Sequence, residues 1–413
     1  MKTSIALAAA ALIGCTGAAV AADRIKIAYI DPLSGGNAAV GEISLNTARF
    51  AAEQINAAGG VNGKKLQIVP FDNKGTPEET LVQAQKAADM GIRFVMQGSG
   101  SGAGSALNEW VRKYNGDNSG KEILYLNYGA ADPALTNAKC NFWHFRWDVG
   151  NDVRMAAITS FIKARPAIKK VYLINQDYSF GQSVQTLARA MLKDARPDIA
   201  IVGDELHPVV KITDFSPYIA KIKASGADTV ITGNWGPDFS LLLKAASDAG
   251  LSVNWLTYYA GAVGGPTAIR QSGLADHVFQ FSEGVANAAP AAAQGFETDF
   301  RAKLGVGLFY PRQVNELRMI AAAATAAKSE EPKVIAAQME DMKFATFDGG
   351  EAYMRKDDHQ FFQDVYISSF GPLGANDKFD EEHTGWGWKL VDTVKKESTV
   401  LPTTCKMERP AAS

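Results

Sequence analysis

Short runs of apolar and β-branched residues alternate with longer runs of helical period along most of this chain. Residues 25–30 and 65–69 fit extended strands, and residues 45–58 between them carry the helical period. A strand, a helix and a second strand in succession are typical of a βαβ unit, whose two strands are parallel. The chain is therefore predicted to be an α/β protein built on parallel sheets.

The alternation occurs in two series, each long enough for a lobe of its own. The first series continues with helices at 78–90 and 105–114 and strands at 93–97 and 122–128. The second follows residue 147, with strands at 170–175, 199–205, 229–232 and 253–257 and helices at 153–163, 182–194, 215–224 and 239–249. The sequence thus predicts two doubly wound parallel-sheet lobes with a cleft between them. Such sheets bind ligands outside the carboxyl ends of their strands, so the strand-to-helix loops are the candidate functional segments.

The composition is that of an ordinary globular protein. Of the 413 residues, 46% are hydrophobic and 21% charged, which excludes collagen, coiled-coil and disordered chains. The 42 Lys and Arg against 44 Asp and Glu give a net charge of −2, with no excess of positive charge to neutralise a phosphate backbone. Nucleic acid is therefore not an expected partner.

The first 22 residues have the features of a secretory signal peptide. Lys2 precedes an apolar run at 5–13, and small residues follow up to Asp23. The run is shorter than the ~20 residues that a transmembrane helix needs. We therefore expect an exported protein that has lost residues 1–22. An alternative stays open, because Leu12-Ile13-Gly14-Cys15 resembles the segment before a lipid-modified cysteine.

Two cysteines remain after the predicted signal peptide, Cys140 and Cys405. In an oxidising compartment an isolated pair is more often a disulfide than a metal site, and neither cysteine has a second Cys or a His at ligand spacing. We predict a Cys140–Cys405 bridge that ties down the C-terminal tail. A reactive thiol is the alternative, and no metal site is expected.

Small polar residues gather in the loops of the first predicted lobe, and aromatic residues gather in those of the second. Loop 98–104 is rich in Gly and Ser and precedes a helix, where backbone N–H groups and the helix dipole can bind an anion. Loops that converge on one crevice form a candidate ligand site. A flexible Gly/Ser turn and aromatic rings packed in the core are the alternatives. The candidate residues are Ser101, Tyr128, Gly129, Ala130, Ala131, Tyr178, Phe180, Trp235, Tyr258 and Tyr259.

The sequence contains no recognisable catalytic motif. A Gly-x-Ser-x-Gly elbow, a Walker loop and a His-Glu-x-x-His pair are absent, and the five His residues are scattered. Gly98, Gly100 and Ala103 match a dinucleotide fingerprint only loosely, at the third strand of their lobe, and an exported protein has little access to NAD. We therefore predict no enzyme activity, no catalytic residue and no cofactor.

Several segments together resemble the periplasmic solute-binding proteins of ABC transporters, in the type I fold and its Leu/Ile/Val-binding branch. The resemblance extends over essentially the whole mature chain. It rests on Asp31-Pro32-Leu33-Ser34-Gly35, on Ile55-Asn56-Ala57-Ala58-Gly59-Gly60-Val61-Asn62-Gly63, on the Gly/Ser loop, on Phe180-Gly181 and on the stretch from Asp214-Phe215-Ser216 to Gly226-Ala227-Asp228.

This resemblance implies a periplasmic monomer whose two lobes close on a small-molecule solute and deliver it to an ABC transporter membrane permease. The lobes are joined by a three-strand hinge, with crossings near 145–147, 279–281 and 347–350. Lobe 1 then comprises 23–146 and 280–348, and lobe 2 comprises 147–279 and 349–413. Ser101, Gly129 and Ala130 match positions that hold a ligand carboxylate, Phe180 matches an aromatic that covers the cleft, and Val40 stands where relatives carry a bulky aromatic.

Two departures from the family pattern concern the ligand. Amino-acid binders usually have Ser or Thr where Ala131 stands, and an acid that pairs with the ligand ammonium where Tyr259 or Ala260 stands. The expected solute is therefore a small carboxylate with an apolar, aromatic body and no free α-ammonium. The alternative is a branched-chain amino acid or a small amide, with Asp238 or Glu283 supplying the acid. A ligand-sensing regulator and a secreted α/β enzyme are the competing classes.

Overall fold

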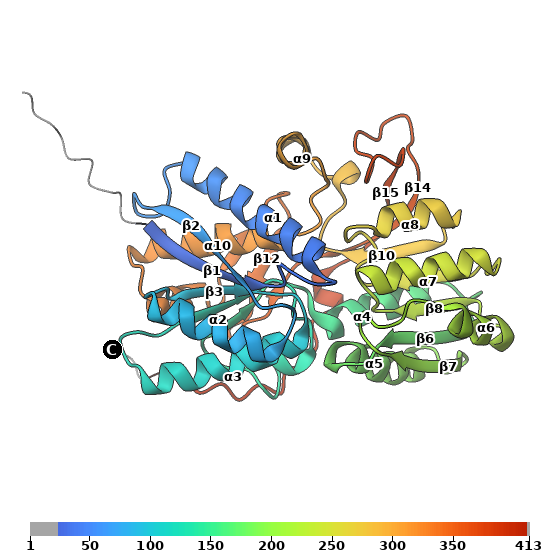
Figure 1. The fold of residues 1–413 in the computed structure, drawn as a ribbon, viewed down its shortest axis with the longest axis horizontal. Coiled ribbons are helices and arrows are strands. Elements are labelled where there is room, and N and C mark those ends of the chain that lie inside the picture. Colours follow the sequence, from blue (N-terminus) through green and yellow to red (C-terminus); the bar gives the residue numbers. More distant parts are fainter. Residues whose placement is uncertain (1–23, 411–413) are drawn as a thin grey trace, which may run out of the picture.

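The computed structural model describes residues 24–410. They form two α/β lobes side by side (Figure 1). The predicted signal peptide at residues 1–22 and the alternative lipid site at Cys15 lie outside the described residues, so both stay predictions.

The first sheet has five strands in the order β2-β1-β3-β4-β5, all parallel. Its strands are β1 (Arg24–Asp31), β2 (Lys65–Asp72), β3 (Phe94–Gln97), β4 (Leu124–Asn127) and β5 (His144–Arg146). The helices that connect them are α1 (Ala38–Ala57), α2 (Pro77–Asp89) and α3 (Ser101–Asp117). Two later helices, α10 (Pro311–Ala327) and α11 (Pro332–Met339), also pack here, with α10 against α1 while α2 packs against α3.

The second sheet has seven strands in the order β15-β14-β10-β9-β8-β6-β7. Five of them are parallel, the four predicted from the sequence and β10, where a crossing was expected: β6 (Lys170–Gln176), β7 (Ala200–His207), β8 (Thr229–Thr232), β9 (Asn254–Thr257) and β10 (Val278–Ser282). Two C-terminal strands, β14 (Val365–Pro372) and β15 (Trp386–Val394), extend one edge in antiparallel pairing. The helices are α4 (Gly150–Lys163), α5 (Ser179–Ala195), α6 (Ser216–Ser225), α7 (Pro237–Asp248) and α8 (Gly265–Ser272).

The remaining elements lie between β10 and β14 in the sequence. After β10 the chain forms α9 (Ala291–Leu304), α10 and α11, and then a small antiparallel sheet. The strands of that sheet are β11 (Lys343–Ala345), β12 (Glu351–Met354) and β13 (Phe361–Phe362). The run Arg355 to Gln360 forms the turn between β12 and β13, and an ion pair between Arg355 and Asp358 closes it.

The prediction of two doubly wound lobes is confirmed, and the differences concern where helices begin. Helix α3 starts at Ser101, one turn before the predicted residue 105, and α1 starts at Ala38 instead of residue 45. The first turn of α3 consists of Ser, Gly and Ala, which carry no apolar period and, apart from Ala, have low helix propensity. That turn is helical because it packs in the cleft, which sequence periodicity does not report.

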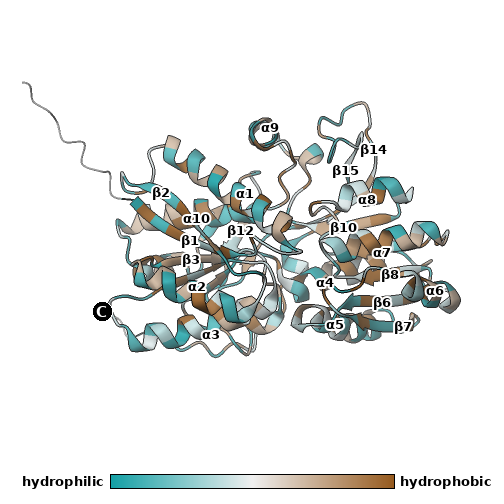
Figure 2. Ribbon diagram, in the orientation of Figure 1, coloured by the Kyte–Doolittle hydropathy of each residue, from teal (hydrophilic) through white to brown (hydrophobic). Residues whose placement is uncertain are grey.

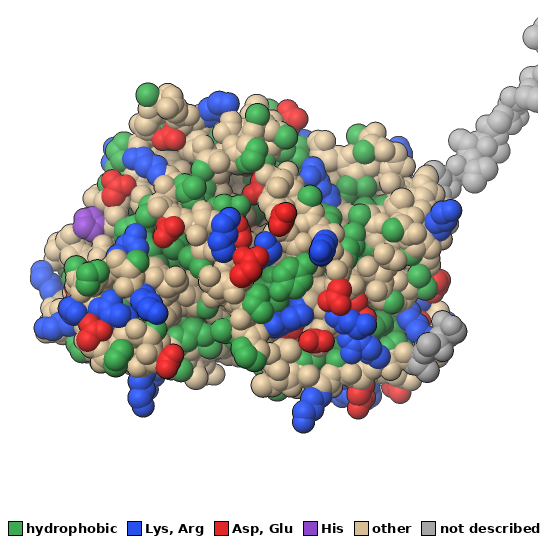
Figure 3. Space-filling model, turned by 180° about the vertical axis from the view of Figure 1, so that it is seen from behind, with side chains coloured by type: hydrophobic (Ala, Val, Ile, Leu, Met, Phe, Trp, Pro, Cys, Tyr) green, Lys and Arg blue, Asp and Glu red, His purple; other side chains and the backbone are tan. Residues whose placement is uncertain are grey.

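Apolar side chains fill three buried clusters. Hydrophobic residues, brown in Figure 2, occur in strands and helices of both lobes. One cluster serves the first lobe, with Val95 and Leu126 among its members. The other two lie on opposite faces of the second sheet, one including Leu173 with residues of α4 and α5, the other including Trp255 with residues of α6, α7 and α8. Helices on both faces are what makes each sheet doubly wound. On the face turned away in Figure 1, acidic and basic side chains are interspersed (Figure 3).

The chain changes lobes at segments that lie next to one another. Arg146, at the end of β5, donates its N–H to His359 O at 3.0 Å and forms a bridge with Gln360. Phe361 belongs to the core of the first lobe and Phe362 to that of the second. In β12, Ala352 and Met354 belong to the core of the first lobe, whereas Tyr353 packs against the core of the second.

Close backbone approach explains glycines near the start of two helices, α1 and α5. A Cβ on Gly41 would lie 1.7 Å from the carbonyl oxygen of Pro32, and one on Gly181 would lie 1.9 Å from that of Gln176. Both distances are far below van der Waals contact, so only glycine lets α1 and α5 pack this closely on the loops that precede them.

The disulfide predicted between Cys140 and Cys405 is present, with Cα atoms 5.7 Å apart. It joins the segment before β5 to the C-terminal tail. The tail is also held by hydrogen bonds from Thr403 Oγ1 to Thr136 O and from Thr404 N to Asn137 Oδ1. The C-terminal residues therefore run back to the first lobe.

Candidate functional site

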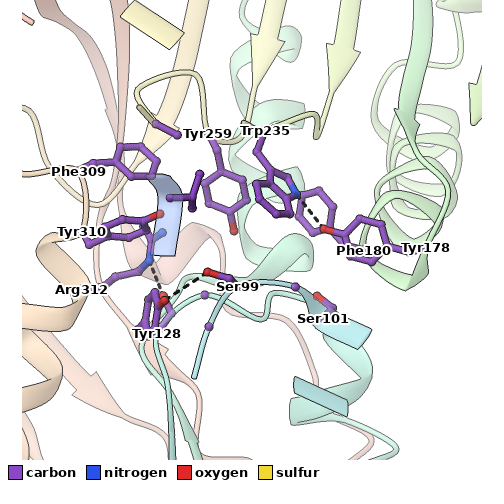
Figure 4. A pocket seen from close by; sticks show the side chains of 15 residues that line it. Ser99, Ser101, Tyr128, Tyr178, Phe180, Trp235, Tyr259, Phe309, Tyr310 and Arg312 are labelled. Carbon is purple, nitrogen blue, oxygen red and sulfur yellow. Dashed lines mark hydrogen bonds between the residues drawn. The ribbon is translucent and has the colours of Figure 1, made fainter. Parts of the chain in front are cut away.

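A pocket lies between the lobes, at the carboxyl ends of the strands of both sheets (Figure 4). It encloses about 440 Å³ of space not filled by protein atoms, part of it open to solvent. Small residues that follow β3 and β4 line one side, and aromatic residues that follow β6, β8 and β9 line the other. Mostly apolar walls with a few polar groups are typical of small-molecule sites.

Seven of the ten predicted site residues line this pocket, namely Ser101, Tyr128, Gly129, Tyr178, Phe180, Trp235 and Tyr259. The other three are buried beside it. Ala130 lies against α3, where a Cβ on Gly104 would come within 2.5 Å of its methyl group, and Ala131 lies in the core of the second lobe. Tyr258 packs edge-on behind Phe180 at 5.8 Å between ring centroids.

A buried carboxylate, Asp31 at the end of β1, fixes the small-residue side of the pocket. Its oxygens accept hydrogen bonds from Gly98 N at 3.1 Å, Ser99 N at 2.9 Å and the Tyr128 hydroxyl at 2.5 Å. Gln97 Nε2 adds a fourth at 3.2 Å. Burial raises the pKa of Asp31 to about 6, although these hydrogen bonds favour its charged form. The loop that faces the pocket is thus anchored from behind.

The backbone N–H groups of Gly129 and Ala130 are already engaged. Both donate to Asn127 Oδ1, at 3.0 and 2.7 Å. The expectation that these two groups hold a ligand carboxylate is therefore not supported by the geometry. Free donors lie instead at the N-terminus of α3, which begins at Ser101. The first hydrogen bond of this helix runs from Gly104 N to Gly100 O. The backbone N–H groups that precede Gly104 in the first turn therefore have no helical acceptor.

Ser101 combines with that helix N-terminus. Its side chain is 1% exposed, and its hydroxyl oxygen accepts a hydrogen bond from Asp132 N at 3.1 Å. The hydrogen of the Ser101 hydroxyl is still free to be donated to a ligand atom. This end of the pocket can therefore bind an anion or another hydrogen-bond acceptor.

Four aromatic side chains from the second lobe form the opposite wall. Tyr178 and Phe180 stack at 5.7 Å, and Phe180 and Tyr259 stack at 5.8 Å between ring centroids. Trp235 is oriented by a hydrogen bond from its Nε1 to the Tyr178 hydroxyl at 2.9 Å. Rings held in this way offer a rigid apolar surface to a ligand.

Sequence reasoning missed Ala262 and a segment just before and within the start of α10. Phe309, Tyr310 and Arg312 all line the pocket. They follow α9 and not a parallel strand, so the βα rhythm gave no reason to select them. The sequence offered one signal that could have identified this segment. Pro311 is typical of the first position of a helix, and Phe309, Tyr310 and Arg312 stand next to it. Val40 and the loop residues Gly98, Ser99 and Gly100 complete the lining.

Arg312 belongs to a buried ionic cluster at the back of the pocket. Its Nη1 donates to Glu283 Oε2 at 3.0 Å, and its Nε lies 3.3 Å from Asp148 Oδ2. Arg154, from α4, pairs with the same two acids at 2.7 Å (Glu283) and 3.4 Å (Asp148). Tyr259 donates its hydroxyl to Asp148 at 3.1 Å. Two arginines and two acids therefore connect the lobes beside the pocket.

Pairing favours the charged forms of Asp148, Arg154 and Arg312 in this cluster. Burial opposes ionisation of Asp148, but Arg154 and Arg312 beside it bring its pKa below the usual range. The same pairing raises the pKa of both arginines despite their burial. Breaking one pair would leave an uncompensated buried charge, which costs several kcal/mol, about 3–5.

Asp238 and Glu283, the two acids that could have paired with the ammonium group of an amino-acid ligand, do not line the pocket. Glu283 is paired with both arginines, and Asp238 accepts hydrogen bonds from Gln176 Nε2 at 2.7 Å and Val210 N at 2.9 Å. Among the described residues of the lining, Arg312 alone carries a charge, and none is Asp or Glu. The pocket wall thus has a positive group and no negative one.

Two further observations concern residues 24–410. No three or more His, Cys, Asp or Glu side chains in this part of the chain come together as a metal ion would require. None of its helices combines the length and apolar character of a membrane span.

Comparison with known proteins gives consistent matches. A family model described as periplasmic binding protein matches residues 24–372. The "Leu/Ile/Val-binding protein homolog 4" of Brucella abortus (strain 2308) is 34% identical, over 99% of this chain and 98% of that protein.

Solved structures agree in fold. The closed conformation of a leucine-, isoleucine-, valine-, threonine- and alanine-binding protein from Brucella ovis has a TM-score of 0.84 at 33% identity, covering 94% of this chain and 100% of that one. A solute-binding protein of an ABC transporter from R. palustris, in complex with benzoate, has a TM-score of 0.76 at 18% identity, covering 93% and 100%. At that identity the second likeness shows the fold alone.

Proposed function

This chain belongs to the periplasmic binding protein family, and we propose that it captures a small aromatic or apolar carboxylate by hinge closure and delivers it to the membrane permease of an ABC importer. The matching family and the relatives are named as binding proteins, which supports a solute-binding role. The proposal concerns which solute the pocket takes, where the protein acts and how it hands the solute on.

The observation that carries the proposal is the absence of Asp and Glu from the described lining of the pocket. An α-amino acid brings an ammonium group into a closed cleft. A buried ammonium without a partner acid costs several kcal/mol, and the acids nearby, Asp148 and Glu283, are already paired with arginines. A solute without a free ammonium avoids this cost.

The two walls of the pocket suit the two parts of an aromatic acid. The stacked rings of Phe180 and Tyr259, with Trp235 beside them, match an apolar or aromatic body. Ser101 and the free N–H groups at the N-terminus of α3 match its carboxylate. The N-terminus of α3 would then bind the carboxylate in place of the N–H groups of Gly129 and Ala130, because those two groups donate to Asn127 Oδ1.

A branched-chain amino acid is the second candidate, because relatives at 34% and 33% identity carry that specificity in their names. It requires a partner for the ammonium. Tyr259, whose hydroxyl already donates to Asp148, and backbone carbonyls would have to serve.

Calorimetric titration with benzoate, phenylpropenoate, leucine, isoleucine and valine tests the proposal. Each solute is titrated into wild-type protein that has been unfolded and refolded to remove any bound ligand. We expect the aromatic acids to bind and the amino acids not to bind. Binding of the amino acids alone would reject the proposal in favour of the second candidate.

Ser101→Ala tests which group holds the carboxylate. We expect affinity for the aromatic acid to fall by about 1–3 kcal/mol, because a hydrogen bond to a charged oxygen is lost. Ser105→Ala is the matched control, since Ser105 stands one turn later on α3 and does not line the pocket. Wild-type affinity in the Ser101 variant would remove this residue from the site.

The remaining parts of the proposal are location and organisation. We propose a periplasmic monomer, exported by the segment 1–22, with lobe boundaries as set out from the sequence except at the third crossing. There the core membership of Phe361 and Phe362 supports a boundary between these two residues.

A further inference from the structure

Two polar groups at the inner end of the pocket have no partner. Arg312 uses its Nε for Tyr128 O and its Nη1 for Glu283, but no hydrogen bond within residues 24–410 involves its Nη2. The Tyr310 hydroxyl also has no hydrogen-bond partner in this part of the chain, although the residue is only 5% exposed. Neither atom is among the fully buried side-chain atoms that lack a partner, so both are free to hydrogen-bond to water or to a ligand atom in the pocket.

The position of the Arg312 guanidinium is fixed. Its Cζ lies 4.9 Å from the Tyr310 ring centroid and 5.6 Å from those of Tyr259 and Phe309. Three rings and two acids thus hold an arginine whose remaining edge borders the cavity (Figure 4). Such a group is prepared to donate to a ligand atom without reorganisation.

This inner end lies opposite the end that we propose for the carboxylate. Ser101 and the start of α3 are on one side of the cavity, and Tyr310 and Arg312 are on the other (Figure 4). A solute whose carboxylate lies at Ser101 directs the far end of its body toward Tyr310 and Arg312.

The charge balance decides what kind of atom the inner end accepts. Arg154 and Arg312 are matched by Asp148 and Glu283, so the cluster has no net charge to offer. Asp31, bonded to Tyr128 next to Tyr310, adds further negative charge nearby. A second full anion would therefore be buried without a cation of its own, whereas a neutral acceptor would satisfy the donors at no such cost.

We infer that Tyr310 and Arg312 form a second polar subsite, which takes an uncharged hydroxyl or carbonyl oxygen at the far end of an aromatic carboxylate. The inference rests on the proposed function and narrows the solute class. The preferred solutes are aromatic acids with a neutral polar substituent opposite the carboxylate.

Tyr310→Phe tests the subsite, because it deletes an unbonded hydroxyl and keeps the ring that packs on Arg312. Two matched pairs of probes are used: benzoate with 4-hydroxybenzoate, and phenylpropenoate with its 4-hydroxy derivative. In the pair that fits the cavity, we expect the hydroxylated acid to bind wild type about 3–10-fold more tightly. In Tyr310→Phe that preference should shrink to about twofold or less, with the affinity of the unsubstituted acid unchanged.

Tyr258→Phe is the control variant. Its hydroxyl is fully buried without a partner and does not line the pocket, so all affinities should match wild type. Terephthalate, which places a second anion at the far end, should bind more weakly than 4-hydroxybenzoate.

Three results would overturn the subsite while leaving the proposed function intact. The first is equal affinity of wild type for both members of each probe pair. The second is tighter binding of terephthalate than of 4-hydroxybenzoate. The third is an equal loss of affinity for hydroxylated and unsubstituted acids in Tyr310→Phe. The last would place the carboxylate itself at Arg312. If no aromatic acid binds and leucine does, the proposed function fails and the subsite fails with it.

Discussion

At the scale of single residues, Asp31 connects the fold to the pocket. It ends β1, is fully buried, and receives hydrogen bonds from Gly98 and Ser99 of the pocket loop and from Tyr128. Its immediate surroundings contain Tyr29 and Tyr125 but no cation within ion-pair distance among the described residues. Its charge is therefore stabilised by dipoles alone, and burial raises its pKa to about 6.

This shift predicts a specific pH dependence of stability. The native carboxyl takes up a proton below about pH 6, whereas the unfolded one does so only near its ordinary value of 3.8. The native state thus binds more protons between these values, so the contribution of Asp31 to the free energy of unfolding falls as pH rises through this window. The fall is about 3 kcal/mol in total.

Asp31→Asn removes that titration. The free energy of unfolding of wild type minus that of the variant, from urea denaturation at pH 4, 5, 6 and 7, should decrease by about 2.4 kcal/mol over the series. Comparing differences at each pH cancels other titrating groups and any constant loss of hydrogen bonds. A difference that is independent of pH would show that Asp31 titrates normally.

At the scale of elements, the C-terminal tail is attached to the first lobe by a disulfide and by hydrogen bonds. The Cys140–Cys405 bridge closes a separation of 265 residues, and Arg355 Nη1 donates to the carbonyl oxygen of Leu401, which precedes Cys405, at 2.8 Å. A covalent link across so many residues restricts the unfolded chain strongly, although it holds only a peripheral segment of the native structure.

Replacing both cysteines by serine should lower the free energy of unfolding by several kcal/mol, with about 5 kcal/mol as an upper bound from chain entropy. Ligand affinity should be unchanged, because neither cysteine lines the pocket. Wild type measured in reducing buffer is the control and should lose the same amount. Mass mapping of the non-reduced protein that finds two free thiols would contradict the bridge.

At the scale of the whole molecule, the buried ionic cluster lies where the lobes meet. Asp148 follows β5, Glu283 follows β10, Arg312 comes from α10 and Arg154 from α4. Separating these groups would cost several kcal/mol, about 3–5 for one broken pair. We therefore expect the cluster to stay intact while the lobes rotate about it, with the opening at the Ser101 end of the pocket.

Small-angle scattering with and without saturating solute measures this motion. We expect the radius of gyration to fall on binding, and the forward scattering to give the mass of a monomer in both states. A solute of the panel that does not bind serves as the control and should leave the curve unchanged. An unchanged radius of gyration at saturation, or the mass of a dimer, would contradict the hinge-closing monomer.

The sequence by itself determined the two-lobed α/β fold, the disulfide and seven lining residues of the pocket. These follow from local patterns: strand and helix periods, the rule that places sites after strands, and an isolated cysteine pair.

Only the tertiary structure decided the rest. Arg312, Tyr310 and Phe309 lie far along the chain from the βα loops, and the packing of α10 against α1 brings them to the pocket. Likewise, nothing local shows that Asn127 occupies the N–H groups of Gly129 and Ala130, or that Glu283 is neutralised by Arg154 and Arg312. Which donors and charges remain free for a ligand depends on partners distant in sequence, and that is a property of the folded chain.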